Sequence, residues 1–362
     1  MHNIIAALKH TDRIYDITLT LTRPLLEKLA PLMQKPFPVL QYLHLRTRDM
    51  LWSLALPSAF LGGSAPQLRS IILLDTAFPT LPRLLLSAVD LVSLQLCEIP
   101  DMVSPEALVL GLYATPQLES LTMRFQSPTY RRDREAARPP LLNRAVLPVL
   151  SKFSFKGNSQ YLEDLVARID APIIDEFDTI LLDEIAYEIP QLTQFICRTE
   201  ESSPYQISIY LLNERVVITL YFGPPSIRRT FWLKMVFDEL DAADMHVLAL
   251  ARVCRHLSPL VSGTERLDVE SMSWPEWDET DNEILVGLFS PFNSVRRIEV
   301  AGTLFPSVAS ALARSTGEMG QMVLPALQDL HLKDTPPPLP EIESFVAARR
   351  LSGHVVTVHY EE

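Results

Sequence analysis

The chain has 362 residues, of which 48% are hydrophobic and 21% charged, and it carries a net charge of −12. So large an apolar share excludes a mainly disordered chain, and no apolar run approaches the roughly 18 residues of a membrane-spanning helix. The acidic excess lies in residues 182–362 and disfavours nucleic acid and anionic membranes as partners, because both bind to basic surfaces.

One apolar pattern recurs from the amino-terminal part of the chain onward. It reads Pro-x-Φ-x-x-Φ-x-Φ, where Φ is Leu, Ile, Val, Met or Phe. The last two apolar residues share one face of a strand, because side chains alternate along strands, and the proline ends the preceding segment. The pattern therefore predicts strands with buried residues such as Leu121, Phe153 and Leu330. Full copies begin at Pro38, Pro66, Pro116, Pro148 and Pro325, looser copies at Pro172 and Pro190, and copies without proline at Ile14, Leu91 and Val295.

The first apolar residues of successive copies are regularly spaced. Separations of 26, 28, 23, 27, 32 and 24 residues lie in or just beyond the range of leucine-rich repeats. Such repeats predict a strand, a turn and a helix that stack with a parallel sheet along one side. The residues compared are Ile14, Leu40, Leu68, Leu91, Leu118, Leu150 and Ile174.

Short helices are expected between these strands. Ser104, Pro105 and Glu106 are typical of a helix start, with a capping residue, a first-turn proline and a first-turn acid. An apolar stripe with helical spacing runs from Leu162 to Ile169. Further helices are expected over residues 241–257, 282–288, 306–314 and 341–350.

The repeat register is lost between Phe195 and Thr264. Three β-rich runs lie there, over residues 206–211, 215–222 and 230–237. We interpret residues 199–263 as degenerate repeats or a small insertion within one solenoid domain that covers residues 1–362. A division into two domains near residue 199 is the competing interpretation.

Several segments carry a family resemblance, beginning with Asn3-Ile4-Ile5-Ala6-Ala7-Leu8. The others are residues 12–14, 104–108, 125–128, 144–148, 155–157, 161–172 and 345–354. Together they resemble the F-box/leucine-rich-repeat-like proteins of mushroom-forming fungi, over nearly the whole chain. The resemblance implies an α/β leucine-rich-repeat-like solenoid, with a curved parallel sheet on one side and short helices on the other. It also implies substrate recognition for a ubiquitin ligase, and none of the matching motifs is catalytic.

An F-box docks on the adaptor of a cullin ligase and contains a Leu-Pro-x-Glu-Leu/Ile run, which is not found near residue 1. The expected partner is therefore a substrate protein, and a cullin-ligase adaptor only if an F-box is supplied elsewhere. A decoy or structural family member without a ligase link is the alternative. An enzyme of an unrecognised class is a second, less favoured alternative.

Candidate partner-binding residues fall into three groups, each with a plainer interpretation as solvated or packed surface. An arginine-rich insertion suits an acidic or phosphorylated peptide, because guanidinium pairs bidentately with oxyanions. Outward strand positions suit a protein partner, and an acidic loop with two tryptophans suits a basic peptide. In that order, the residues are Arg124, Tyr130, Arg131, Arg132, Arg134 and Arg138; His44, Thr122, Ser154 and His331; and Trp274 and Trp277.

The sequence has none of the common catalytic, nucleotide-binding or zinc motifs. His246 and His256 are ten residues apart on one expected helix, which is not the ligand spacing of a single metal. Cys197 and Cys254 are expected to be small buried residues, and the separated cysteines and the lack of a secretory signal favour a reducing compartment. We therefore expect an intracellular protein, cytoplasmic or nuclear, without catalytic activity, metal or cofactor.

Overall fold

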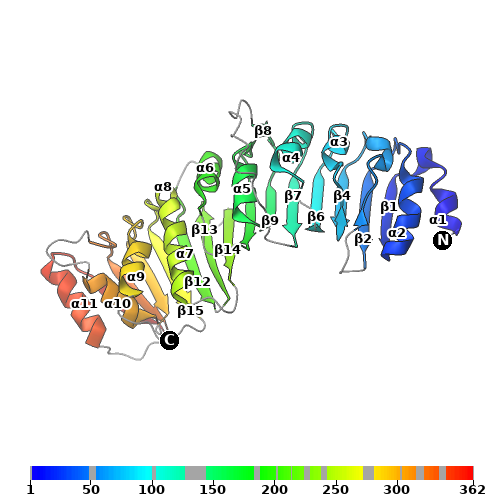
Figure 1. Ribbon diagram of the computed structural model, residues 1–362. Helices are drawn as coiled ribbons and strands as arrows, with labels where there is room; N and C mark the ends of the chain where they lie inside the picture. Colours follow the sequence, from blue (N-terminus) through cyan, green and yellow to red (C-terminus); the bar gives the residue numbers. More distant parts are fainter. Residues whose placement is uncertain are drawn as a thin grey trace, which may run out of the picture. The chain divides into compact units, whose positions relative to one another are not determined.

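The computed structural model shows a mixed α/β chain with a large, mostly parallel sheet of 14 strands and short helices. It divides into two compact units, Met1–Phe177 and Asp178–Glu362, and in each unit the helices lie on one side of the strands (Figure 1). The structure describes residues 2–48, 54–99, 103–126, 144–182, 188–200, 203–212, 214–223, 229–237, 243–271, 281–301, 304–314, 322–333 and 340–361.

In the first unit, the main strands follow one another along the sheet in chain order, and every pairing with a described register is parallel. They are β1 (Asp16–Leu21), β2 (Tyr42–Thr47), β4 (Ser70–Leu74), β6 (Ser93–Ile99), β7 (Ser120–Phe125) and β9 (Lys152–Gly157), followed by β11 (Glu176–Leu181), within which the two units divide. Two short parallel pairs join β3 (Leu54–Ala55) to β5 (Thr76–Ala77) and β8 (Ala145–Val146) to β10 (Ile169–Asp170). The helical segments are α1 (His2–Ala7), α2 (Arg23–Leu29), α3 (Leu81–Leu85), α4 (Pro105–Leu112) and α5 (Ser159–Val166), with 3-10 turns η1 (Thr11–Arg13), η2 (Ala30–Met33) and η3 (Phe60–Gly63).

The strands of the full copies begin where the apolar pattern predicts them, and the proline of each full copy opens a β-turn. The Thr115 carbonyl accepts a hydrogen bond from the Leu118 amide at 3.2 Å, so Pro116 occupies the second turn position. The fixed φ of proline favours that position. The same bond joins Phe37 and Leu40, Ala65 and Leu68, Ala88 and Leu91, Leu147 and Leu150, and Leu324 and Leu327.

A shared carbonyl ties each strand entry to the next. The Glu119 carbonyl accepts hydrogen bonds from the Ser151 and Lys152 amides, at 3.0 and 3.1 Å. Two successive amides bound to one carbonyl fix the register between neighbouring strands. Register partners along β1, β2, β4, β6, β7 and β9 are therefore 26, 28, 23, 27 and 32 residues apart, as the apolar spacing predicts. The same double acceptor occurs at Tyr15, Gln41, Arg69, Val92, Ser151, Glu265 and Arg296.

The second unit combines an antiparallel and a parallel part. The β-rich runs form β12 (Gln206–Leu212), β13 (Arg215–Phe222) and β14 (Arg229–Val236), which pair antiparallel. β12 also pairs parallel with β15, and the parallel order continues through the last strands. These strands are β15 (Arg266–Ser271), β16 (Arg297–Ala301), β17 (Asp329–Lys333) and β18 (Thr357–Glu361). The helices are α6 (Pro190–Thr199), α7 (Ala243–His256), α8 (Ser258–Val261), α9 (Asp281–Phe289), α10 (Phe305–Arg314) and α11 (Pro340–Leu351).

Pro190 opens helix α6, so the strand expected from its loose copy of the pattern is wrong. Leu192, Phe195 and Ile196 are buried at the i, i+3, i+4 spacing of a helix. The apolar step of three residues is common to the strand-entry pattern and to a helix, and here the helix forms. Cys197 then falls on the exposed side of α6, so its expected burial is wrong as well, whereas Cys254 is buried as predicted.

Alternation along the strands places the core on the helix side of each sheet. Leu121, Phe153 and Leu330 are at most 1% exposed, as the pattern predicts. Their neighbours in sequence are partly or fully exposed and lie on the opposite face. In each unit the sheet therefore has one face covered by helices and an opposite face that no described helix covers, which we call the helix-free face.

Candidate interaction surface

The helix-free face of the first unit carries a row of aligned side chains. His44 on β2, Thr122 on β7 and Ser154 on β9 occupy one register position, with Ile72 and Gln95 between them on the intervening strands. All five are partly exposed. The structure thus confirms the outward position of the three predicted residues and brings them onto one face.

Two side chains on this face have polar atoms without a hydrogen-bond partner. They are His44, at Nε2, and Arg124, at Nε, and both atoms are shielded from solvent. A shielded polar atom without a partner lowers stability, and it can gain a partner from another molecule only when its side chain turns outward. Both side chains are partly exposed, so His44 and Arg124 could gain hydrogen bonds by turning toward another molecule.

Arg124 lies near the carboxyl end of β7, beside a cluster at the carboxyl ends of β4, β6 and β7. Asp75 and Glu98 both adopt left-handed backbone conformations there, with φ of 54° and 52°, which non-glycine residues rarely adopt. Gln126 Nε2 donates to Asp75 Oδ1 at 3.4 Å. Burial raises the pKa of Asp75, and Glu98 raises it further, whereas Arg46 and the Gln126 hydrogen bond lower it.

Burial is also the main influence on Cys97, which stands in this cluster at intermediate exposure. It raises the pKa of the Cys97 thiol, and the positive charge of Arg124 opposes the shift only in part. The thiol is therefore protonated near neutral pH, and a protonated thiol is a weak nucleophile. The cluster presents polar groups rather than a reactive sulfur.

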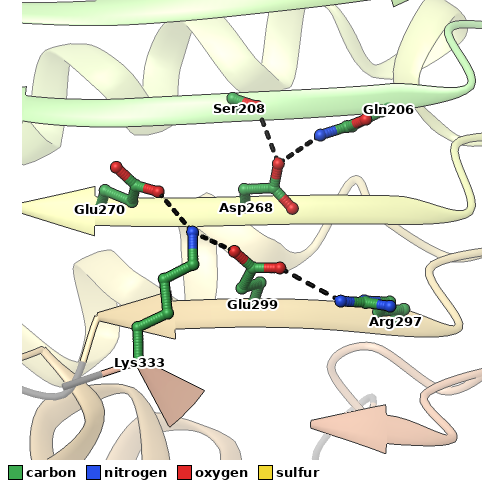
Figure 2. Close-up of polar contacts among 7 residues, drawn as sticks. All are labelled: Gln206, Ser208, Asp268, Glu270, Arg297, Glu299 and Lys333. Carbon is green, nitrogen blue, oxygen red and sulfur yellow. Dashed lines mark hydrogen bonds and ion pairs between the residues drawn. The ribbon is translucent and has the colours of Figure 1, made fainter. Parts of the chain in front are cut away.

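The helix-free face of the second unit carries a connected charge network (Figure 2). Lys333 on β17 forms ion pairs with Glu299 on β16 and, at 3.0 Å, with Glu270 on β15. Arg297 donates to Glu299 at 3.3 Å. These groups meet because they come from parallel strands in register and point to the same face.

The network sets the protonation of its members. Burial raises the pKa of Glu299, but hydrogen bonds and charge from Lys333 and Arg297 outweigh it, so the pKa lies below its ordinary value. Hydrogen bonds to Glu299 and Glu270 raise the pKa of Lys333. Lys333 and Arg297 together therefore balance the two negative charges of Glu270 and Glu299 on this face.

Asp268 on β15 lies beside this network and forms a separate hydrogen-bonded group (Figure 2). Its carboxylate accepts hydrogen bonds from Gln206 Nε2 and, at 2.9 Å, from Ser208 Oγ on β12. Burial raises the pKa of Asp268 above its ordinary value, although both hydrogen bonds oppose the shift. These residues could not be identified as a group from the sequence, because only the pairing of β12 with β15 brings them together.

A pocket of about 430 Å³ opens at the amino ends of β15 to β18. His331 lines it, and its ring stacks on His359 with 4.4 Å between centroids. His359 Nε2 lies 3.2 Å from Asp329 Oδ1. His331 is outward-facing as predicted, but its neighbours come from register that the sequence alone does not specify. The lining residues are Glu265, Arg266, Arg296, Arg297, Gln328, Asp329, His331 and His359.

The remaining predicted site residues, apart from Arg124, lie outside the part of the chain that the structure describes. They are Tyr130, Arg131, Arg132, Arg134, Arg138, Trp274 and Trp277.

Neither a metal centre nor a membrane span is found in the described segments. The described residues contain no group of three or more histidine, cysteine, aspartate or glutamate side chains that could hold a metal ion. No helix that the structure describes combines the length and apolarity needed to cross a bilayer.

Comparison with known proteins assigns no family to the chain. The chain matches no protein-family model, and no curated protein resembles it significantly in sequence.

Proposed function

We propose that this chain is a leucine-rich-repeat-like solenoid that acts as a non-catalytic protein-interaction module. The solenoid interpretation is supported by the sequential order of the main strands and the one-sided helices of the first unit. Its register spacings of 23 to 32 residues are close to those of leucine-rich repeats. In such folds the uncovered sheet face serves as an extended binding surface.

The observation that carries the proposal is the set of aligned polar side chains on the helix-free face of the first unit. His44, Thr122 and Ser154 share one register position, and His44 and Arg124 each hold a shielded polar atom without a partner. A face built only for solvent would leave such atoms hydrated. We infer that a protein partner covers this row and supplies the missing hydrogen bonds.

The fungal F-box resemblance gives this partner a role. We propose that the chain recognises an intracellular substrate protein, as the recognition part of an F-box ubiquitin-ligase receptor does. A cullin-ligase adaptor joins only through an F-box supplied elsewhere. The alternative is a decoy or structural family member that binds the same partner without ubiquitin transfer.

The test is quantitative affinity purification of the tagged full chain from its native cells, followed by mass spectrometry and reconstitution with the purified partner. The control variant is Leu110→Arg, because Leu110 is 62% exposed on helix α4. The test variant is Thr122→Arg, which adds the same group on the helix-free face. We expect one protein to be retained by the parent chain and by Leu110→Arg and lost from Thr122→Arg.

Co-purification of cullin-adaptor proteins with that partner separates the ligase receptor from the decoy. Loss of the partner from neither variant, or from both, would contradict the assignment of the binding face.

A further inference from the structure

Two guanidinium groups in the pocket at the amino ends of β15 to β18 have no acidic partner among the residues that the structure describes. Neither Arg266 nor Arg296 forms an ion pair or a hydrogen bond through its side chain with any residue that the structure describes. Arg266 instead lies over the ring of Tyr205, 4.9 Å from its centroid. A stacked guanidinium keeps its N–H edges free for hydrogen bonds.

Two of the other charged side chains in the pocket already contact another side chain. Arg297 pairs with Glu299, and Asp329 contacts His359. Glu265 and Asp329 are the two acids of the lining, and three arginines line the same pocket, so the lining has an excess of one formal positive charge. The pocket is therefore locally positive on a chain whose net charge is −12.

The shape and the hydrogen-bonding groups of the pocket fit a small ligand. Its volume of about 430 Å³ lies within the roughly 300–1,000 Å³ typical of small-molecule sites. Gln328 and the stacked pair His331 and His359 add nitrogen donors to the lining. Planar guanidinium groups pair bidentately with carboxylate and phosphate.

We propose that this pocket binds a small ligand through an oxyanionic group, a phosphate or a carboxylate, held by Arg266 and Arg296. The site is separate from the partner-binding row of the first unit, and it stands whether or not that row binds a protein. Its ligand and the protein partner are therefore tested by different measurements.

The experiment measures binding of phenyl phosphate, benzoate and benzamide to the full chain by titration calorimetry at low salt. The three probes share a ring and differ in the group that the pocket reads, so the first two separate phosphate from carboxylate. We expect saturable binding of at least one anion and none of benzamide. Replacing Arg266→Gln and Arg296→Gln together should weaken binding of that anion by about tenfold or more.

The matched control is Arg69→Gln with Arg255→Gln, two exposed arginines, one in each unit and both outside the pocket lining. It removes the same formal charge and should change the affinity by less than about twofold. Where the first pair of substitutions disturbs folding, Arg296→Gln alone replaces it, because Arg296 is exposed. No saturable binding of either anion, equal binding of benzamide, or equal losses in the two double variants would overturn the proposal.

Discussion

At the scale of single residues, buried polar groups distinguish this chain from a simple apolar repeat. Arg349 on α11 is fully buried and donates from Nη2 to the Val323 carbonyl at 2.6 Å and from Nη1 to the Leu324 carbonyl at 3.3 Å. Leu324 has a φ of 50° and starts the turn that leads into β17. Because burial disfavours its charge, the pKa of Arg349 is lowered. This arginine joins the last long helix to a strand entry.

Replacing Arg349→Ala should lower the free energy of unfolding by about 3 kcal/mol, because two buried carbonyls lose a charged donor and a cavity forms. Chemical denaturation measures the change. Arg350→Ala is the matched control, since Arg350 is exposed on the same helix and should change stability by less than about 0.5 kcal/mol. Equal effects of the two substitutions would show that the buried contacts contribute nothing.

Asp268 gives a pH-dependent prediction with a defined sign. Its folded-state pKa is raised, so the folded chain binds the proton more tightly than the unfolded chain. Its contribution to stability is therefore greatest at pH values below the unfolded pKa and falls as pH rises through the folded pKa. The substitution Asp268→Asn keeps the shape of the side chain but removes its ionisable carboxyl group.

The Asp268→Asn variant should gain stability relative to the parent between about pH 4 and pH 7. Urea denaturation across that range measures the difference. Glu299→Gln should show the opposite trend in a more acidic range, below about pH 4, because the pKa of Glu299 is lowered and its contribution to stability is lost as pH falls through the folded pKa. The same pH trend for both variants would contradict the charge network.

At the scale of elements, the turn that opens each strand is the repeated unit. Pro116 and its equivalents hold the second turn position, whereas Val89 takes that position in the turn between Ala88 and Leu91. Val89 is 49% exposed, and its turn makes the same hydrogen bond as the others. Proline restricts the unfolded chain where its φ suits the folded one.

Val89→Pro should therefore stabilise the first unit by about 0.4–1 kcal/mol, and Pro116→Val should destabilise it by a similar amount. Thermal and chemical denaturation of the two variants provide the measurement. Destabilisation by Val89→Pro would mean that this turn differs from the proline-containing ones.

The sequence predicted helices and strands correctly where the spacing of the apolar residues fits only one of the two structures. The Φ-x-Φ strands and their spacing were predictable because alternation and turn chemistry agree, and Ser104 caps α4 by accepting from the Ala107 amide at 3.2 Å, as expected. Helix α6 was missed because Leu192 and Phe195 have a spacing that fits two structures.

The antiparallel pairing of β12, β13 and β14 was also beyond the sequence, since strand composition does not specify a partner.

The residues of the candidate interaction surface also divide into those that the sequence predicts and those that it does not. Outward positions such as His44 were predictable from alternation alone. The ion pairs of Lys333 depend on which strands lie side by side, and the register that decides this is a tertiary property. The two unshared pocket arginines were missed for the same reason.

At the scale of the whole molecule, the sheet and its helices bury an apolar core in each unit. Leu121 and Leu330 are fully buried in the first and second unit. Leu→Ala at either position should cost about 2–5 kcal/mol through lost burial and cavity formation. Hydrogen exchange should show the loss of protection centred on the strands that flank the substitution, because repeats depend on their nearest neighbours. Uniform loss over residues 1–362 would contradict this repeat-based account.

The central claim is that the helix-free face of the first unit binds a protein partner. The measurement that tests it most directly is the affinity of the purified partner for the parent chain, Thr122→Arg and Leu110→Arg, each checked for an unchanged melting temperature. We predict a loss of about tenfold or more for Thr122→Arg, since a bulky charge at a packed interface disrupts it, and no measurable loss for Leu110→Arg. Unchanged affinity for Thr122→Arg together with a loss for Leu110→Arg would place binding on the helix side and contradict the account.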